Sequence, residues 1–298
     1  MKYAIGVDIG GTNIRLAIVD EKGNIIQVLK SPTDKSNGKE SLLNQIICMF
    51  NSLDYSKYDI IGVGVGVPGP VNPQNGDVYV IPNLNITEIP IKSYLENKLN
   101  LPVYVGNDAN VAALAEAKIG NGKDYNVVQY LTLSTGIGGG LIINGRMVTG
   151  HYGFAQEVGN TIIRRGGRRP SIFKPGGCIE GLASGNSLLE IAAENNLSIK
   201  HVGELFLEAK NGNKIAQDIK NVWIEDMAAF IGNIVALLEP DIFVLGGGLM
   251  KSSNLFLDEL IKKVDDYVFE FLKGKIRIVS AKYDQDAGII GAAMQVFN

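Results

Sequence analysis

The chain has 298 residues, of which 46% are hydrophobic and 20% charged, and this profile predicts a globular protein of two domains rather than a disordered chain. Its net charge of −3 and its lack of a long basic segment argue against a nucleic-acid partner. Only Cys48 and Cys178 could form a disulfide, and no run of about 18 apolar residues predicts a membrane span, so we expect a cytoplasmic protein with no membrane partner.

The N-terminal part begins with a predicted three-stranded meander. Residues 2–9 and 14–20 have strand patterns, a glycine-rich turn joins them, and a third strand follows near 25–30. The next predicted elements are a helix near 39–52, a strand at 60–68, a strand near 77–81, a helix near 90–99, a strand at 102–107 and a helix at 108–119. Glycines alternate along the strand at 60–68, which indicates that another element packs closely against it. This order of elements predicts an α/β architecture.

The second half repeats the beginning of the first half. A strand at 126–133 leads into the turn STGIGGG at 134–140, and strands at 141–143 and 146–148 follow. Two hairpins with glycine turns therefore lie roughly 125 residues apart, which suggests a structural duplication.

The C-terminal part is predicted to be mostly helical. We expect residues 150–187 to be irregular and a buried helix to run from Ile215 to Leu238, where Pro240 ends it. A strand with a glycine turn at 241–250, an amphipathic helix at 257–272, a strand at 275–281 and a helix at 286–297 follow. Asp286 is the expected N-cap of the last helix.

Three glycine turns follow directly after apolar strands, at residues 10–13, 134–140 and 246–248. Backbone amides in such turns can point at phosphate oxygens with no side chain in the way. The three turns could surround one ligand if two domains face each other across a cleft. The chain contains no G-x-x-x-x-G-K-[ST], and its first turn lacks G-x-G-x-x-G, so neither a P-loop nor a dinucleotide-binding fold is predicted.

The turn sequences DIGGTNIRLAIVD, LSTGIGGGLIING and DIFVLGGGLM resemble the phosphate-1, phosphate-2 and adenosine motifs of the actin-like ATPase superfamily. Within it, the chain resembles the ROK family of sugar kinases and repressors, because GVGVPGPV, GNDANVAALAE, FAQEVGN and GGCIEGLASG match that family in order. The resemblance implies a two-domain, actin-like (ribonuclease H-like) α/β fold with an interdomain cleft. It places the first domain at residues 1–115, completed by a helix at 287–298, and the second at 116–286.

The resemblance also implies roles for individual residues. Asp108 corresponds to the catalytic base that takes the proton of a sugar hydroxyl, although Asn107 or Asp108 could simply cap the helix that begins there. Asp8 is expected to orient Mg²⁺ through its water shell, with a turn-forming role as the alternative. The expected contacts of ATP are Gly10, Gly11, Thr12, Asn13, Ser134, Thr135, Gly136, Gly138, Gly246, Gly247 and Gly248. The expected contacts of the sugar are Gly69, Asn107, Asp108, Glu157, Asn160 and Glu180.

The chain departs from the family pattern at a structural zinc site. The positions that hold one histidine and three cysteines in most members read Asn160, Ser171, Phe173 and Cys178. A single thiolate cannot form a closed tetrahedral site, so we predict no zinc. The segment RRGGRRPSIFKPGG must then be held by packing and hydrogen bonds, or be mobile until substrate arrives. Its basic residues could assist an anionic product or be solvated, and solvation is the expected state.

These features predict a kinase that moves the γ-phosphoryl group of ATP to the 6-hydroxyl group of a hexose or an N-acylhexosamine. In zinc-bearing relatives a histidine at the position of Asn160 reaches the sugar near its second carbon, so N-acetylmannosamine is the first candidate and glucose the second. The alternative is a non-catalytic sugar-binding regulator, for which the start of the phosphate turn near Asp8 leaves no room for a helix-turn-helix. A filament or chaperone relative of actin would lack the EVGN and GCIE motifs. Because members are commonly dimers, we expect a homodimer.

Overall fold

The computed structural model describes residues 1–171 and 174–297, and these fold into two compact units. Unit 1 comprises Met1–Asn126, Gly140–Gln156 and Lys282–Asn298, whereas unit 2 comprises Val127–Gly139 and Glu157–Ala281. Both units combine a sheet with helices, so the predicted α/β class is confirmed.

Unit 1 contains a five-stranded sheet with the order β3-β2-β1-β4-β7. Its strands are β1 (Lys2–Ile9), β2 (Asn13–Asp20), β3 (Ile25–Pro32), β4 (Asp59–Val67) and β7 (Val103–Asn107). The first three pair antiparallel as the predicted meander, and β4 and β7 extend the sheet in parallel. A separate ladder pairs β5 (Val78–Ile81) with β6 (Ile86–Ile89). The sequence analysis did not predict β6, which follows β5 after a short 3-10 turn at Pro82–Leu84.

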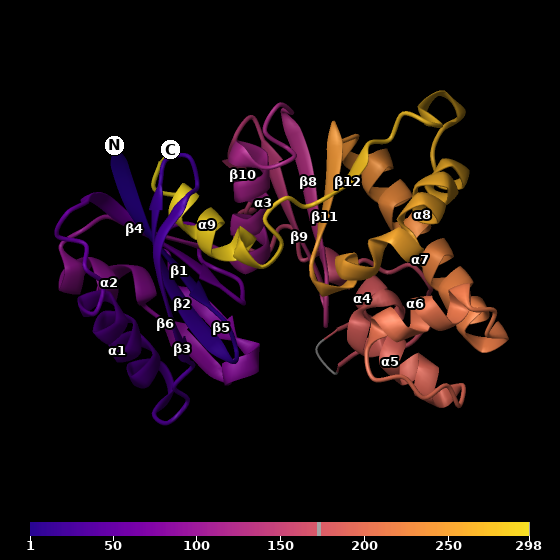
Figure 1. The fold of residues 1–298 in the computed structure, drawn as a ribbon, viewed down its shortest axis with the longest axis horizontal. Helices are drawn as coiled ribbons and strands as arrows, with labels where there is room; N and C mark the ends of the chain where they lie inside the picture. Colours follow the sequence, from indigo (N-terminus) through magenta and orange to yellow (C-terminus); the bar gives the residue numbers. More distant parts are fainter. Residues whose placement is uncertain (172–173, 298) are drawn as a thin grey trace. The chain divides into compact units, whose positions relative to one another are not determined.

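The alternation of side chains along β1 and β4 decides which helix covers which face of this sheet. Valines and isoleucines of both strands share a core with α1 (Gly38–Asn51) and α2 (Ile91–Leu99). Gly6 and Gly64 face the other way, toward α9 (Ala287–Met294), and Figure 1 shows α9 across the sheet from α1 and α2. A Cβ atom on Gly64 would lie 1.7 Å from the carbonyl oxygen of Ala292. The glycines therefore let α9 lie directly on the sheet, which confirms the close packing that their alternation predicted.

Asp286 precedes α9 but does not cap it, so that prediction is wrong. An N-cap residue usually has an extended backbone, whereas Asp286 has φ −94° and ψ −6°, because a 3-10 turn at Asp284–Asp286 continues into the helix. The Asp286 carboxylate instead accepts a hydrogen bond from Arg15, which also donates to the carbonyl oxygen of Gln285 at 2.7 Å.

The second sheet has the strand order β10-β9-β8-β11-β12, which repeats the order of the first sheet. Its strands are β8 (Val127–Leu133), β9 (Ile137–Ile143), β10 (Arg146–Met147), β11 (Ile242–Gly246) and β12 (Ile278–Ser280). The shared order supports the predicted duplication. The predicted turn at 134–140 is too long, however, because β9 already begins at Ile137. The glycines at 138–140 lie within the strand, where a Cβ on Gly139 would be 2.8 Å from the Val158 side chain.

Unit 2 is otherwise helical. Its helices are α4 (Ile179–Ala183), α5 (Gly185–Glu194), α6 (Val202–Lys210), α7 (Lys214–Leu238) and α8 (Leu257–Val264). Two sequence predictions are wrong here. Residues 150–187 include α4 and the start of α5, which are hard to recognise because α4 completes little more than one turn. The helix expected at 257–272 ends at Val264, and the backbone becomes extended at Val268, whose side chain packs against the unit 2 core.

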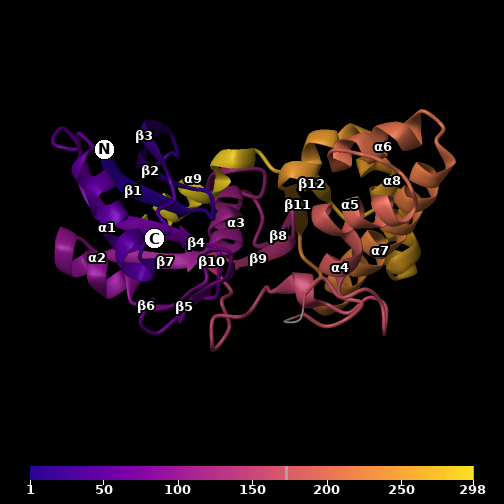
Figure 2. The same cartoon turned by 90° about the horizontal axis from the view of Figure 1, so that it is seen from below.

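The long helix α7 forms the centre of unit 2. Figure 2 shows the other helices of the unit grouped with it, and Trp223 and Phe230 on α7 are almost fully buried. By length and composition alone α7 could cross a membrane, with a mean hydropathy of 1.4 in its most apolar window. Because 56% of that window is buried inside the protein, α7 has the character of a core helix.

Candidate functional site

The first glycine turn joins β1 to β2, because Ile9 pairs with Ile14 and the residues between them form the connection. The Gly10 amide donates to the carbonyl oxygen of Asn13 at 2.9 Å. Thr33, at the end of β3, holds the turn from outside: its hydroxyl donates to the Gly10 carbonyl at 2.7 Å and its amide to the Thr12 carbonyl at 2.9 Å. Among the described residues, the amides of Gly11 and Thr12 donate to no protein acceptor. They are therefore available to an anion.

The sequence analysis missed two residues that shape this turn. Thr33 is almost fully buried, and Asn83 follows β5, where its Cβ lies 3.1 Å from the position that a Cβ on Gly11 would take. Neither belongs to a motif that the sequence analysis singled out, and both are far from the turn along the chain. No local sequence signal could have identified them.

Asp8 lies on β1 directly before the turn and pairs in register with Arg15 on β2 and Gly66 on β4. Burial raises the pKa of its carboxyl group, the charge of Arg15 opposes this, and the charge of Asp286 adds to it. Arg15 is itself paired with Asp286. A divalent cation beside Asp8 would favour its ionised form, and the role of Asp8 in orienting magnesium stays a prediction.

Of the two adjacent residues Asn107 and Asp108, Asn107 takes the capping role, and the role of Asp108 as catalytic base stays a prediction. Asn107 is the N-cap of α3 (Asp108–Ile119), and its Oδ1 accepts hydrogen bonds from the amides of Ala109 at 3.0 Å and Asn110 at 3.3 Å. Its Nδ2 also donates to the carbonyl oxygen of Gly69 at 3.3 Å. Asp108 occupies the first helical position, and one of its carboxylate oxygens accepts from the Ala109 amide at 2.8 Å. Asp108 thus lies at the positive end of the α3 dipole.

The second glycine turn, Ser134–Gly136, connects β8 to β9 in unit 2. The start of α5 holds it, because the amides of Gly185 and Asn186 donate to the carbonyl oxygens of Ser134 at 2.8 Å and Thr135 at 3.2 Å. In the part of the chain that the structure describes, the amides of Thr135 and Gly136 have no protein acceptor. This turn thus resembles the first in offering amides to an anion, whereas Gly138 lies within β9.

The third glycine turn lies beside the second. β8 and β11 are parallel neighbours, so their carboxyl ends meet at the same edge of the sheet. A Cβ on Gly246 would lie 2.2 Å from the Tyr130 hydroxyl oxygen, and Gly247 has φ +91°, so both positions require glycine. A Cβ on Gly248 would lie 3.7 Å from Ser134 Oγ. The structure therefore brings the predicted adenosine turn and Ser134 together.

The predicted sugar residues of unit 2 are associated with a lysine that the sequence analysis did not select. Glu180 Oε2 accepts from the Ile137 amide at 3.0 Å, and Oε1 pairs with Lys174 Nζ at 3.1 Å. Glu157 is exposed as a residue, but burial of its carboxyl group raises the pKa of that group. The charge of Lys174 lowers this pKa, and the charge of Glu180 raises it. Asn160 Oδ1 is buried and has no hydrogen-bond partner among the described residues.

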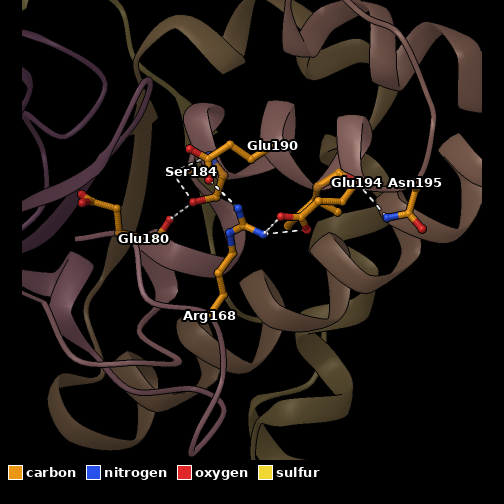
Figure 3. Close-up of polar contacts among 8 residues, drawn as sticks. Arg168, Glu180, Ser184, Glu190, Glu194 and Asn195 are labelled. Atoms are coloured by element: carbon orange, nitrogen blue, oxygen red, sulfur yellow. Dashed lines mark hydrogen bonds and ion pairs between the residues drawn. The ribbon is translucent and has the colours of Figure 1, made fainter. Parts of the chain in front are cut away.

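The basic segment at residues 164–177 is only partly solvated, so the expectation of solvation is wrong for three of its side chains. Arg164 pairs with Asp226, Lys174 pairs with Glu180, and Arg168 pairs with Glu190 and Glu194, as Figure 3 shows. Each of these acidic partners lies on a helix that the sequence analysis could not place relative to the segment. Arg165 and Arg169 are exposed as expected.

Of the positions that replace the zinc ligands, three lie within the described residues. Cys178 is fully buried directly before α4, and Asn160 ends the 3-10 turn Val158–Asn160. Ser171 is exposed, and Phe173 lies outside the described residues. No group of three or more His, Cys, Asp and Glu side chains suited to a metal occurs within residues 1–171 and 174–297.

Removing the Arg164 side chain is expected to destabilise unit 2. Arg164 Nε and Nη2 both lie 2.8 Å from Asp226 Oδ1, and the Asp226 side chain is only 5% exposed. Arg164→Met leaves this carboxylate buried without its partner. We expect the free energy of unfolding to fall by about 2 kcal/mol, which is less than the usual cost of breaking a buried ion pair because Arg164 itself is half exposed. Fluorescence of the single tryptophan, Trp223, during urea unfolding measures the change, and Arg165→Met is the matched control.

The loss should also depend on pH. Burial raises the pKa of Asp226 and the charge of Arg164 lowers it, so removing Arg164 raises that pKa further. A carboxyl group whose pKa is higher in the folded than in the unfolded state makes the fold less stable as pH rises through that interval. The decrease in the free energy of unfolding caused by Arg164→Met should therefore be greater at about pH 8 than at about pH 5. An equal loss at both values would contradict this explanation.

Unit 2 also contains an apolar cavity of about 270 Å³ between α4, α5 and α7. Leu188, Ile219 and Trp223 are among its lining residues, and none of the predicted site residues lines it. We assign it no role in binding ATP or sugar.

Comparison with known proteins shows one consistent relationship. Residues 4–297 match the family model described as the ROK family. The chain is 32% identical to a glucokinase of Streptomyces coelicolor, over 98% of this chain and 97% of that protein. It is 33% identical to an N-acetyl-D-glucosamine kinase of Haemophilus influenzae, over 97% of each chain. Its structure resembles a ROK family glucokinase from Streptomyces griseus in complex with glucose and AMPPNP, with a TM-score of 0.78, 29% identity and 98% of each chain covered. This similarity confirms the predicted actin-like ATPase fold.

Proposed function

The chain belongs to the ROK family, and from this we propose that it is a kinase that transfers the γ-phosphoryl group of ATP to the 6-hydroxyl group of a hexose or an N-acylhexosamine. Relatives named as glucokinase and N-acetyl-D-glucosamine kinase support this substrate class. A related glucokinase in complex with glucose and AMPPNP, an analogue of ATP, supports the nucleotide. The observation that carries the proposal is the Asp108 carboxylate in the first turn of a helix whose cap is supplied by Asn107.

We assign the phosphates of ATP to the two glycine turns at residues 10–13 and 134–136. The amides of Gly11, Thr12, Thr135 and Gly136 supply donors to phosphate oxygens, which carry most of the charge in phosphoryl transfer. The adenosine is assigned to the turn at 246–248. Magnesium, held by Asp8 through water, would neutralise charge on the phosphate oxygens when bound.

Asp108 is the proposed general base. As the 6-hydroxyl oxygen of the sugar forms its bond to the γ-phosphorus, Asp108 accepts the hydroxyl proton. The bond between that phosphorus and the bridging oxygen of the β-phosphate breaks, and ADP leaves with the electron pair. Asn107 supports this step because its side chain fixes the start of α3 and so holds the carboxylate in place.

The sugar is assigned to Gly69, Asn107, Asp108, Glu157, Asn160 and Glu180. Asn160 directs the choice within the substrate class, because its buried Oδ1 has no partner among the described residues and an unpaired buried acceptor is unfavourable. The N–H group of an N-acyl substituent could supply the missing donor. Within the proposed class, N-acetylmannosamine is the first substrate to test and glucose the second. We further propose that the enzyme is a cytoplasmic homodimer.

A coupled assay of ADP release tests this function. Purified protein with MgATP is supplied with glucose, mannose, fructose, N-acetylglucosamine or N-acetylmannosamine, and we expect sugar-dependent ADP release with at least one of them. Mass spectrometry of the product identifies the phosphorylated hydroxyl group. If sugars bind by calorimetry but none releases ADP, the chain is instead the non-catalytic regulator of the alternative hypothesis.

A further inference from the structure

The segment from Thr161 to Gly177 connects two predicted sugar residues. It begins after the 3-10 turn that ends at Asn160 and leads into α4, which carries Glu180. Its described residues form no helix or strand, apart from an isolated bridge between Ile162 and Cys178. Such a segment has no repeating backbone hydrogen bonds of its own, so its position depends on contacts with other parts of unit 2.

Backbone hydrogen bonds close the base of the segment. The Ile163 amide donates to the Gly177 carbonyl at 2.9 Å, and the Gly177 amide donates to the Arg168 carbonyl at 2.7 Å. Gly177 has φ +80°, and a Cβ there would lie 1.6 Å from the Arg164 carbonyl oxygen, so only glycine fits. These bonds join the two ends of the segment to each other. The Ile179 amide on α4 also donates to the Thr161 carbonyl at 2.8 Å, and Arg164 pairs with Asp226 on α7, but none of these contacts reaches α5.

Arg168 connects the segment to α5. Its Nη1 lies 2.7 Å from both carboxylate oxygens of Glu194, and its Nη2 donates to Glu190, one helical turn earlier, as Figure 3 shows. The guanidinium group presents its N–H donors in a fixed fork, which suits two carboxylates on one helix face better than a lysine would. The hydrogen bonds that Arg168 donates to Glu194 and Glu190 raise its pKa, and its side chain is only 27% exposed.

The helix α5, which Arg168 contacts, also forms hydrogen bonds with a predicted sugar residue and a predicted ATP residue. The Ser187 hydroxyl on α5 donates to the Glu180 backbone carbonyl at 2.8 Å, while the Glu180 side chain points away from the arginine in Figure 3. At the start of the same helix, the Gly185 amide donates to the carbonyl of Ser134 in the phosphate turn. One face of α5 therefore fixes the segment, and its first turn fixes Glu180.

We propose that Arg168 is a positioning residue for sugar binding, which holds the described residues of the segment Thr161–Gly177 on α5 and thereby keeps Lys174 beside Glu180. This inference rests on the proposed function. Without the arginine, the segment keeps the closed base but loses its attachment to α5. Lys174 then no longer stays at its place 3.1 Å from Glu180, and the sugar has to order the segment as it binds. ATP binding does not require that step.

Kinetics of Arg168→Met test the proposal, with the neighbouring exposed Arg169→Met as the matched control. We expect the sugar KM to rise about tenfold, while kcat and the KM for ATP stay within about twofold. Arg169→Met should leave all three unchanged. Glu194→Gln should raise the sugar KM as well, and the double variant should be no worse than Arg168→Met alone, because both changes remove one interaction. A sugar KM within about twofold of the wild-type value in Arg168→Met overturns the proposal.

A second measurement needs no substrate. Hydrogen exchange followed by mass spectrometry should show faster exchange of peptides from residues 161–177 in Arg168→Met and Glu194→Gln, but not in Arg169→Met. Saturating sugar should restore protection from exchange in Arg168→Met and Glu194→Gln. Unchanged exchange in both variants overturns the proposal. If the wild-type chain phosphorylates no sugar but the exchange result holds, the proposed function fails and the attachment by Arg168 stands.

Discussion

Replacing Asp108 by asparagine is expected to lower kcat for sugar phosphorylation by about 10²–10⁴-fold, the usual contribution of a general base. Asparagine has nearly the same shape, and its Oδ1 can still accept the hydrogen bond from the Ala109 amide, which the carboxylate accepts at 2.8 Å. It cannot accept a proton from the sugar hydroxyl. Because Asn107 supplies the cap of α3, the helix should remain intact. Steady-state ADP release at saturating sugar and ATP measures the effect.

The control for this variant is Asp124→Asn, which makes the same chemical change at an exposed position beyond the end of the same helix. It should retain wild-type kcat. Thermal unfolding of Asp108→Asn should also match the wild-type protein, because the cap is unchanged. An Asp108→Asn protein that keeps its kcat within about tenfold contradicts the assignment of Asp108 as the base.

Replacing Gly64 by alanine is expected to destabilise unit 1 by about 3 kcal/mol, near the upper end of overpacking costs. The added methyl group would lie 1.7 Å from the carbonyl oxygen of Ala292, so the backbone of α9 would have to move away from β4. Backbone cannot yield as the end of a flexible side chain can. Far-UV circular dichroism during heating should show a fall in Tm of roughly 10 °C.

Gly38→Ala separates this steric effect from the effect of backbone conformation. Gly38 begins α1 with φ +57°, and no atom lies within 4 Å of the position of its added Cβ. Its replacement should therefore cost only about 1 kcal/mol, the strain of a left-handed conformation. If both variants melt at the same temperature, close packing of α9 is not what the glycine at position 64 provides.

The predicted site residues differ in how well the sequence located them. The turn at 10–13 lies between two strands with clear alternation, so its place at the end of a hairpin followed from local pattern alone. The turn predicted at 134–140 is longer than the observed one, because Gly138–Gly140 look like turn residues in the sequence but lie in a strand. Gly139, for example, has the Val158 side chain close to it, and a short stretch of sequence around Gly139 does not include Val158.

Ion pairs were the least predictable part of the candidate site. The arginines of the segment at 164–177 read as a solvated basic cluster, yet Arg168 meets Glu190 and Glu194 on a helix that follows much later in the chain. Likewise, Lys174 reaches Glu180 although nothing in their spacing indicates a pair. Composition and charge pattern do not indicate such pairs, because the path of the backbone between the partners decides whether they come together.

The sequence by itself determined the α/β class, most strands and helices, the three glycine turns and the ROK relationship, because each depends on residues that are close together or on motifs in a fixed order. Only the tertiary structure decided that Asn107 rather than Asp108 caps α3, that Asp286 binds Arg15, and that Thr33 holds the first turn. Asp286 and Thr33 bind groups that lie far from them along the chain, whereas the cap of α3 depends on the extended backbone at Asn107. Folding brings together atoms from distant parts of the chain, and the local sequence carries no record of that proximity.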